Sequence, residues 1–126
     1  MSDFYQTGVV ATFHRLGRAD IEKIEAELTW YSQGRPIALV LPSLYSELEG
    51  EALKGIIREL KEVKYIDEIV VALGPATEEE FNYAKKFFSE LPQKTSIIWN
   101  TGPRIGEMYK TIERAELPVG EPGKGR

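Results

Sequence analysis

The stretch that decides the fold reads Ile-Ala-Leu-Val-Leu-Pro-Ser-Leu-Tyr-Ser-Glu and occupies residues 37–47. Its apolar part is short and continuous, and it ends at Pro42. Two later stretches have the same character: residues 68–73, which Gly74 stops, and residues 95–99, which a turn follows. Unbroken apolar runs of this length are typical of strands covered on both faces, as in a parallel sheet.

Segments with helical periodicity separate these runs. Apolar residues between positions 48 and 63 recur on one helix face, with charged residues on the other. Ser46 and Glu49 fit a capping box, so this helix is predicted to begin directly after the strand-end loop. Thr77 and Glu80 repeat the same start signal after the second run.

The helix that starts near Thr77 is predicted to end at Pro92, and a shorter amphipathic stretch follows Pro103. Strands and helices therefore alternate along the chain. This order predicts an α/β fold, with a Rossmann-like and mostly parallel sheet that carries helices on both faces.

The chain is divided here into an N-terminal extension, residues 1–36, and a main unit, residues 37–126. Within the extension we expect a strand at Gly8–Phe13 and a helix from Ile21 to Leu28. Two adjacent aromatic pairs are predicted to pack in a core or an interface: Trp30 with Tyr31, and Phe87 with Phe88.

Composition points to an ordinary globular protein. Of the 126 residues, 42% are hydrophobic and 29% charged, and the formal net charge of −4 gives no reason to expect nucleic-acid binding. The sequence has no cysteine, which excludes disulfides and cysteine-based metal sites. No apolar run is long enough to cross a membrane and no secretory signal is present, so we expect a cytoplasmic protein. The many Glu and Lys residues suggest a thermophilic source.

In open parallel sheets ligands bind beyond the carboxyl ends of the strands. Three loops qualify here: residues 42–47, 74–77 and 100–104. The first combines a rigid turn, backbone amides, the Tyr45 ring and the Glu47 carboxylate, a set suited to a nucleoside. Glu47 can accept hydrogen bonds from ribose hydroxyls. Helix capping alone is an equally good interpretation of the same residues.

Other standard sites lack their signatures. The sequence contains no glycine-rich dinucleotide or P-loop motif. His14 is the only histidine and the three aspartates are scattered, so no metal site and no catalytic triad is predicted. The closing residues, Gly123-Lys124-Gly125-Arg126, offer backbone amides and cations to a diphosphate, although a flexible charged tail is the commoner explanation.

Taken together, residues 38–47, the Asp67-Glu68 pair before the second strand and the Gly123–Arg126 turn resemble the GT-A glycosyltransferases. Within that group the chain is most similar to the glucosyl-3-phosphoglycerate synthases. The resemblance implies an incomplete domain of the nucleotide-diphospho-sugar transferase type, ending at residue 126.

The resemblance implies a glycosyltransferase that uses a nucleotide-diphospho-sugar such as UDP-glucose, with 3-phosphoglycerate as a small phosphorylated acceptor. The nucleoside would lie against the first loop, the base or diphosphate near Lys124, and no catalytic residue is assigned. The binding residues carried over are Pro42, Ser43, Leu44, Tyr45, Glu47, Gly74, Gly123 and Lys124.

The chain departs from the family at Tyr45, Ser46 and Glu47, where Asn-Glu or Glu-Glu is usual, and it lacks an Asp-X-Asp metal motif. A divalent cation, Mg²⁺ or Mn²⁺, is therefore expected only in a longer enzyme, and this chain alone is expected to be inactive. The alternative is a stand-alone, non-catalytic α/β binding or regulatory domain. Because half of a sheet leaves an apolar surface uncovered, we also expect a homo-oligomer.

Overall fold

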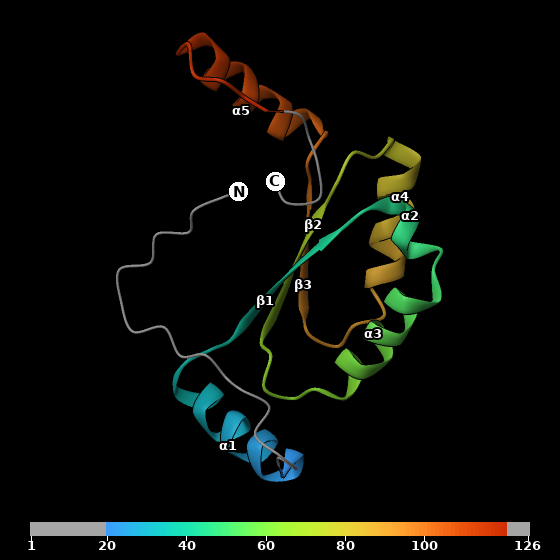
Figure 1. Ribbon diagram of the computed structural model, residues 1–126, viewed down its shortest axis with the longest axis vertical. Coiled ribbons are helices and arrows are strands. Elements are labelled where there is room, and N and C mark those ends of the chain that lie inside the picture. The colour runs from blue at the N-terminus through green and yellow to red at the C-terminus, as the bar shows by residue number, and fades with distance from the viewer. Residues whose placement is uncertain (1–19, 121–126) are drawn as a thin grey trace, which may run out of the picture.

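The computed structural model describes residues 20–120, which form an α/β unit (Figure 1). Within these residues no helix combines the length and the apolar character needed to cross a membrane. The elements follow in the order α1 (Ile21–Gly34), β1 (Ala38–Ser43), α2 (Tyr45–Leu48), α3 (Glu51–Glu62), β2 (Glu68–Leu73), α4 (Glu78–Phe88), β3 (Lys94–Trp99) and α5 (Pro103–Arg114).

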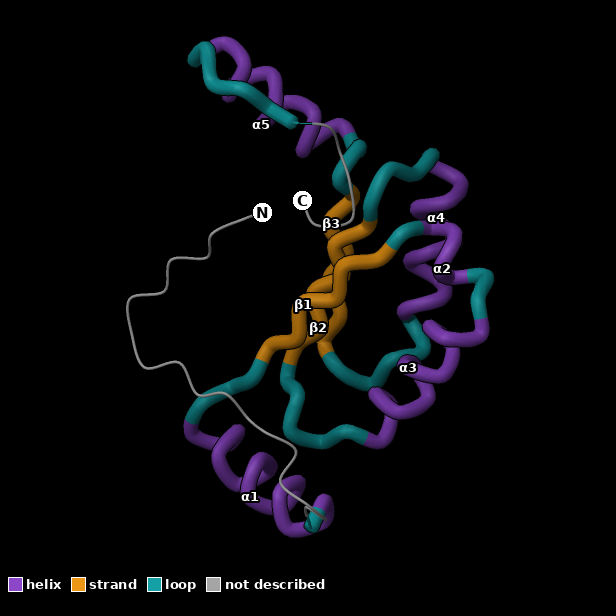
Figure 2. Tube along the Cα trace, viewed as in Figure 1, coloured by secondary structure: helices purple, strands orange, loops and turns teal. Residues whose placement is uncertain are grey.

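The strands form one parallel sheet in the order β1-β2-β3. They pair so that their last residues, Ser43, Leu73 and Trp99, lie side by side at the carboxyl edge. Crossovers between parallel strands are almost always right-handed, so two crossovers in the same direction place their helices on the same face. Figure 1 shows α3 and α4 together on one side of the sheet, and Figure 2 shows the strands running together beside them.

The core lies between that face and these two helices. Alternate residues of a strand point to opposite faces, and the helix-facing side chains of the central strand β2 are wholly buried. They pack against the apolar stripes of α3 and α4. The buried residues that make up this contact are Ile69, Val71 and Leu73 of β2, Leu53, Ile57 and Leu60 of α3, and Ala84 and Phe88 of α4.

The opposite face of the sheet is open in the part of the chain that the structure describes. Val40 of β1 is 61% exposed and Ile98 of β3 is 43% exposed. Helices α1 and α5 extend from opposite ends of the sheet (Figure 1) and bury none of their own side chains. The predicted α/β fold with a parallel sheet and flanking helices is confirmed, whereas covering of both faces is not found among residues 20–120.

The helical segment after β1 begins differently from the sequence prediction. The capping box predicted at Ser46 and Glu49 is wrong, because the periodic segment is split into α2 and α3 at Gly50, the N-cap of α3. The carboxylate that caps α2 belongs to Glu47 and accepts from the Leu44 amide at 2.9 Å. The capping box of α4 is confirmed.

The extension is described only from residue 20, so the strand predicted at Gly8–Phe13 lies outside the described residues. Its predicted helix is present as α1, with Asp20 as the N-cap, but it continues past the predicted end at Leu28 to Gly34 and includes Trp30 and Tyr31. Trp30 and Tyr31 pack against each other edge to face, yet they are 67% and 60% exposed. The pair is therefore not part of a core in the described structure, whereas Phe88 is wholly buried, as predicted.

A glutamine ties the end of α3 to the beginning of β3. The side-chain amide nitrogen of Gln93 donates to the carbonyl oxygens of Leu60, at 2.6 Å, and Val63, at 2.9 Å. Carbonyls in the last turn of a helix lack intrahelical partners, so Gln93 supplies donors where the helix needs them. The Lys61–Glu90 ion pair, at 2.6 Å, joins α3 to the turn after α4 and lowers the pKa of Glu90.

The substitution Gln93→Glu replaces the two amide donors by a carboxylate that faces the negative end of a helix. We expect the free energy of unfolding to fall by about 2 kcal/mol at neutral pH, measured by urea denaturation. Because the folded state would raise the pKa of the introduced group, part of this loss should return on mild acidification. Gln33→Glu, at an exposed position in the last turn of α1, is the control and should change stability by less than about 0.5 kcal/mol. An equal loss from both substitutions would contradict this role for Gln93.

Candidate functional site

The three loops singled out in the sequence meet at the carboxyl edge of the sheet. The Gly74 amide donates to the Ser43 carbonyl oxygen at 2.8 Å, which joins the loops after β1 and β2. The Ala76 amide donates to the Thr101 hydroxyl oxygen at 3.2 Å, which joins the loops after β2 and β3. The parallel register alone brings the strand ends together, and these bonds fix the loops to one another.

The loop after β1 is held by its own acidic residue. Glu47 accepts the Leu44 amide through one carboxylate oxygen, so the capping interpretation of this residue is correct. A carboxylate has two oxygens with several acceptor positions. Its place at the N-terminus of α2 fixes where a hydroxyl donor would have to approach.

Two other residues of this loop, also predicted to bind the ligand, differ in their exposure to solvent. Ser43 is only 1% exposed, and its hydroxyl donates to the Leu44 carbonyl oxygen at 3.3 Å. In this conformation Ser43 positions the loop and has almost no surface for a ligand to contact. Pro42 is exposed on the open face of the sheet, one residue before the edge.

Gly74 leaves room for the Leu44 side chain of the neighbouring loop. A Cβ atom built at this position would lie 2.7 Å from Cδ2 of Leu44 and 3.6 Å from the Ser43 carbonyl oxygen. The first distance is shorter than side chains tolerate, so any larger residue at position 74 must displace the Leu44 side chain. Gly74 therefore contributes to the site by shaping the loop that carries Leu44.

Tyr45 begins α2 beside another tyrosine. Its ring meets the ring of Tyr83 edge to face, with centroids 5.9 Å apart. Partial burial raises the pKa of the Tyr45 phenol, and the carboxylates of Glu49 and Glu80 raise it further. The phenol is therefore held in its neutral, hydrogen-bond-donating form into more alkaline solution than an ordinary tyrosine.

The loop after β3 is more ordered than the sequence suggested. The indole nitrogen of Trp99 donates to the Ala76 carbonyl oxygen at 2.9 Å, and the Thr101 hydroxyl donates to the same oxygen at 3.0 Å. The ring of Trp99 stacks on Phe81 of α4, with centroids 4.7 Å apart. From the sequence, residues 100–104 were predicted only as a turn. The one signal available was a tryptophan at the end of a strand, where its N–H needs a partner.

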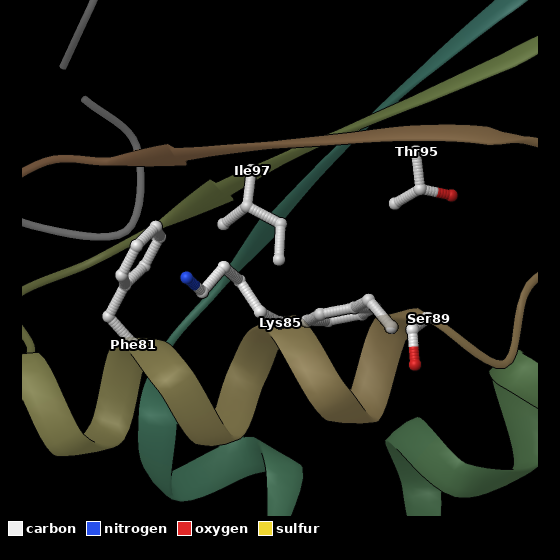
Figure 3. A pocket seen from close by; sticks show the side chains of 6 residues that line it. Phe81, Lys85, Ser89, Thr95 and Ile97 are labelled. Atoms are coloured by element: carbon white, nitrogen blue, oxygen red, sulfur yellow. The ribbon is translucent and has the colours of Figure 1, made fainter.

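Beyond Trp99 the surface is hollowed. A cavity of about 560 Å³ lies between the end of β3 and the first turns of α5, lined mainly by apolar side chains. A second hollow, of about 320 Å³, continues between α4 and β3, where Figure 3 shows Lys85 between Phe81 and Ile97. The Lys85 ammonium lies 5.0 Å from the centre of the Phe81 ring, a cation–π contact. Both hollows share Phe81 and Ile97 in their walls.

Two predicted ligand contacts lie beyond the description. Gly123 and Lys124 fall outside residues 20–120, so their expected contact with a diphosphate stays a prediction. Within the described residues no group of three or more His, Asp or Glu side chains is arranged to hold a metal ion. The described part of the site therefore offers loops for binding and no assigned catalytic group.

Two curated relatives match nearly the whole chain. The glucosyl-3-phosphoglycerate synthase of Persephonella marina is 44% identical over 126 residues, which are 100% of this chain and 31% of that protein. The glucosyl-3-phosphoglycerate synthase of Methanococcoides burtonii is 30% identical over 125 residues, 98% of this chain and 30% of that protein. The chain thus spans about a third of the length of these relatives. No family model and no solved structure matches it. The resemblance to glucosyl-3-phosphoglycerate synthases inferred from the sequence is confirmed.

Replacing Gly74 by alanine should displace Leu44 and loosen the first loop. We expect Gly74→Ala to lower the free energy of unfolding by about 1–2 kcal/mol, measured by urea denaturation. Gly55→Ala is the control, because a Cβ at Gly55 meets nothing within 4 Å and the residue lies inside α3. That substitution should stabilise the protein by about 0.5–1 kcal/mol. Stabilisation by both changes would show that the Leu44 side chain can move aside without cost and that position 74 does not require glycine.

The ionisation of Tyr45 is a second test of the loop. The ultraviolet absorbance is titrated with pH for the unchanged protein and for Tyr45→Phe. The difference between the two curves is the titration of the Tyr45 phenol, and its midpoint should lie above the ordinary tyrosine pKa. The sign follows from the raised folded-state pKa: the contribution to stability is present at neutral pH and is lost as the pH rises through the pKa of the folded state. Glu49→Gln should bring the titration closer to the ordinary value. An unshifted difference curve would contradict the described environment.

Proposed function

We propose that this chain forms the nucleotide-binding part of a glycosyltransferase that takes a sugar from a nucleotide-diphospho-sugar. The observation that carries the proposal is the 44% identity to a glucosyl-3-phosphoglycerate synthase over all 126 residues, because a match of this extent includes every strand-end loop described above. The name of that relative supports a glucosyl group as the transferred sugar and 3-phosphoglycerate as the acceptor. UDP-glucose is the donor that we propose.

The position of the loops supports the same proposal. Ligands of open parallel sheets bind outside the carboxyl ends of the strands, and the three loops are joined to one another at that edge. We place the nucleoside against the loop after β1, with the Glu47 carboxylate accepting from the ribose hydroxyls. Leu44 and Tyr45 supply partly exposed surface beside it. Lys124 is proposed to neutralise the diphosphate.

In the proposed reaction the bond between the anomeric carbon and the diphosphate oxygen breaks, and a bond to the acceptor hydroxyl oxygen forms. The nucleoside diphosphate leaves and the hydroxyl loses its proton. The described residues contribute binding and orientation to this reaction. A divalent cation in the longer enzyme would stabilise the leaving diphosphate, but no described cluster fits one, so no step is assigned to it here.

Isothermal titration with UDP and with GDP tests the proposal. We expect weak binding of a nucleotide that is unchanged by Mn²⁺, because the sequence has no Asp-X-Asp motif and residues 20–120 hold no cluster suited to a cation. Glu47→Gln keeps an oxygen for capping and removes the charge, so it should weaken binding about tenfold.

Glu80→Gln is the matched control for that substitution. Glu80 caps α4 as Glu47 caps α2, accepting the Thr77 amide at 2.8 Å, but it lies in the first turn of α4, after β2. It should leave nucleotide affinity within about twofold of the unchanged protein. Equal losses from both changes would remove the proposed role of Glu47. No heat with either nucleotide, from a folded sample, would favour the non-catalytic domain instead.

A further inference from the structure

The loop after β2, residues 74–77, is joined to the loop after β3 through one side chain. The Ala76 amide donates to the Thr101 hydroxyl oxygen at 3.2 Å, and that hydroxyl donates to the Ala76 carbonyl oxygen at 3.0 Å. A hydroxyl group has one proton to donate and two lone pairs that accept, so a single threonine can satisfy both backbone groups of one residue. Thr101 therefore pairs with Ala76 as a residue of a neighbouring strand would.

This contact begins where the sheet ends. The parallel pairing of β2 with β3 stops at Leu73 and Trp99, and the Asn100 amide donates to the Leu73 carbonyl oxygen at 3.1 Å. Beyond that bond, the hydrogen bonds between the two loops within residues 20–120 come from side chains. They are those of Thr101 and that of the Trp99 indole nitrogen, which donates to the Ala76 carbonyl oxygen at 2.9 Å. The position of the loop after β2 therefore depends on side chains of β3 and of the turn that follows it.

Thr101 is itself held in place. The Gly102 amide donates to the Trp99 carbonyl oxygen at 3.0 Å, which closes a turn that contains Thr101. A Cβ atom at position 102 would lie 2.8 Å from atoms of the Trp99 ring, so the turn lies directly against that ring. The same ring stacks on Phe81 of α4. The Thr101 hydroxyl is thus presented to Ala76 by a turn with little freedom to move.

We infer, on the basis of the function proposed above, that Thr101 is a positioning residue of the nucleotide site. It raises the affinity for the nucleotide by holding the loop after β2 at the carboxyl edge. Gly74, one of the binding residues that the family resemblance implies, lies in this loop two residues before Ala76. A loop that is held before the ligand arrives loses less conformational entropy on binding. Thr101 has this effect through Ala76 and without contacting the nucleotide.

A purely structural role is the alternative. Thr101 is exposed to solvent, so water can replace its hydrogen bonds to Ala76 when the hydroxyl is removed. Little of the free energy of unfolding should therefore depend on this hydroxyl, whereas the freedom of residues 74–77 should. A structural role would change the unfolding of the whole protein. A positioning role would change the hydrogen exchange of the Ala76 amide and the affinity for nucleotide.

Three threonine variants separate these roles. Thr101→Val removes the hydroxyl and keeps the shape of the side chain, whereas Thr101→Ser keeps the hydroxyl. Thr111→Val is the control, because it removes an exposed hydroxyl that donates to the Glu107 carbonyl oxygen within α5, at 3.0 Å. UDP is titrated into each 126-residue protein, or GDP if the unchanged protein binds only GDP, and magnetic resonance spectra give the dissociation constant. Spectra without nucleotide give the exchange rate of the Ala76 amide, and urea denaturation gives the unfolding midpoint.

Thr101→Val should weaken nucleotide binding about fivefold and speed exchange of the Ala76 amide about fivefold, because the loop gains freedom that binding must remove. Thr101→Ser and Thr111→Val should stay within about twofold of the unchanged protein in both measurements. The two valine variants should lower the urea midpoint equally, by less than about 0.5 M. Trp99→Phe keeps the ring stack and removes the second donor to Ala76, so it should weaken binding about threefold.

Unchanged affinity of Thr101→Val, in a protein that binds nucleotide, would exclude the positioning role and leave the proposed function standing. A loss of affinity that Thr101→Ser does not restore, or that Thr111→Val shares, would assign the effect to general destabilisation and overturn the role as well. If the unchanged protein binds neither UDP nor GDP, the proposed function fails and the positioning role fails with it.

Discussion

The structure depends on the position of β2 between two parallel neighbours. Both of its edges are used for pairing, and its helix-facing side chains are wholly buried. A shift of either neighbour by one residue would turn its apolar side chains to the wrong face, so burial of this strand fixes the register of the whole sheet. The register therefore determines where the loops at the carboxyl edge lie.

The carboxyl edge shows how short-range chemistry then refines what the register sets. Glu47, Gly74 and Trp99 each act on a neighbouring loop or turn, through a carboxylate, an absent side chain and an indole N–H respectively. The loops are therefore held in place by the paired strands that precede them and by hydrogen bonds to one another. Groups held in this way keep their geometry without a ligand, which reduces the entropy lost when one binds.

Much of the fold could be read from the sequence, because strand runs and amphipathic helices leave clear periodic patterns. The capping box of α4 was correct since Thr77 and Glu80 have the right spacing. The equally well-spaced pair Ser46 and Glu49 was misleading, because Gly50 interrupts the helix and the competing contact from Glu47 prevails. Local spacing does not reveal which of two neighbouring carboxylates reaches an amide.

Other features could not be predicted from the sequence, because they depend on the three-dimensional arrangement of the elements. Apolar strands predicted two covered faces, but which face the helices take depends on the strand order, which periodicity does not encode. The contacts of Trp99 and Gln93 join residues that are more than twenty positions apart and belong to no motif. The topology predicted that the three loops meet at one edge of the sheet, but not the contacts that each of their residues makes.

The contact between Gln93 and the end of α3 affects how the molecule unfolds locally. The hydrogen bond to Val63 joins residues thirty positions apart, and the chain between them contains β2 and α4. Those two elements therefore lie within a loop whose ends are tied together, and closing such a loop has already cost its conformational entropy. While the tie holds, neither element gains the freedom of an open chain by detaching alone. The central strand and its following helix should thus behave as one cooperative unit in local unfolding.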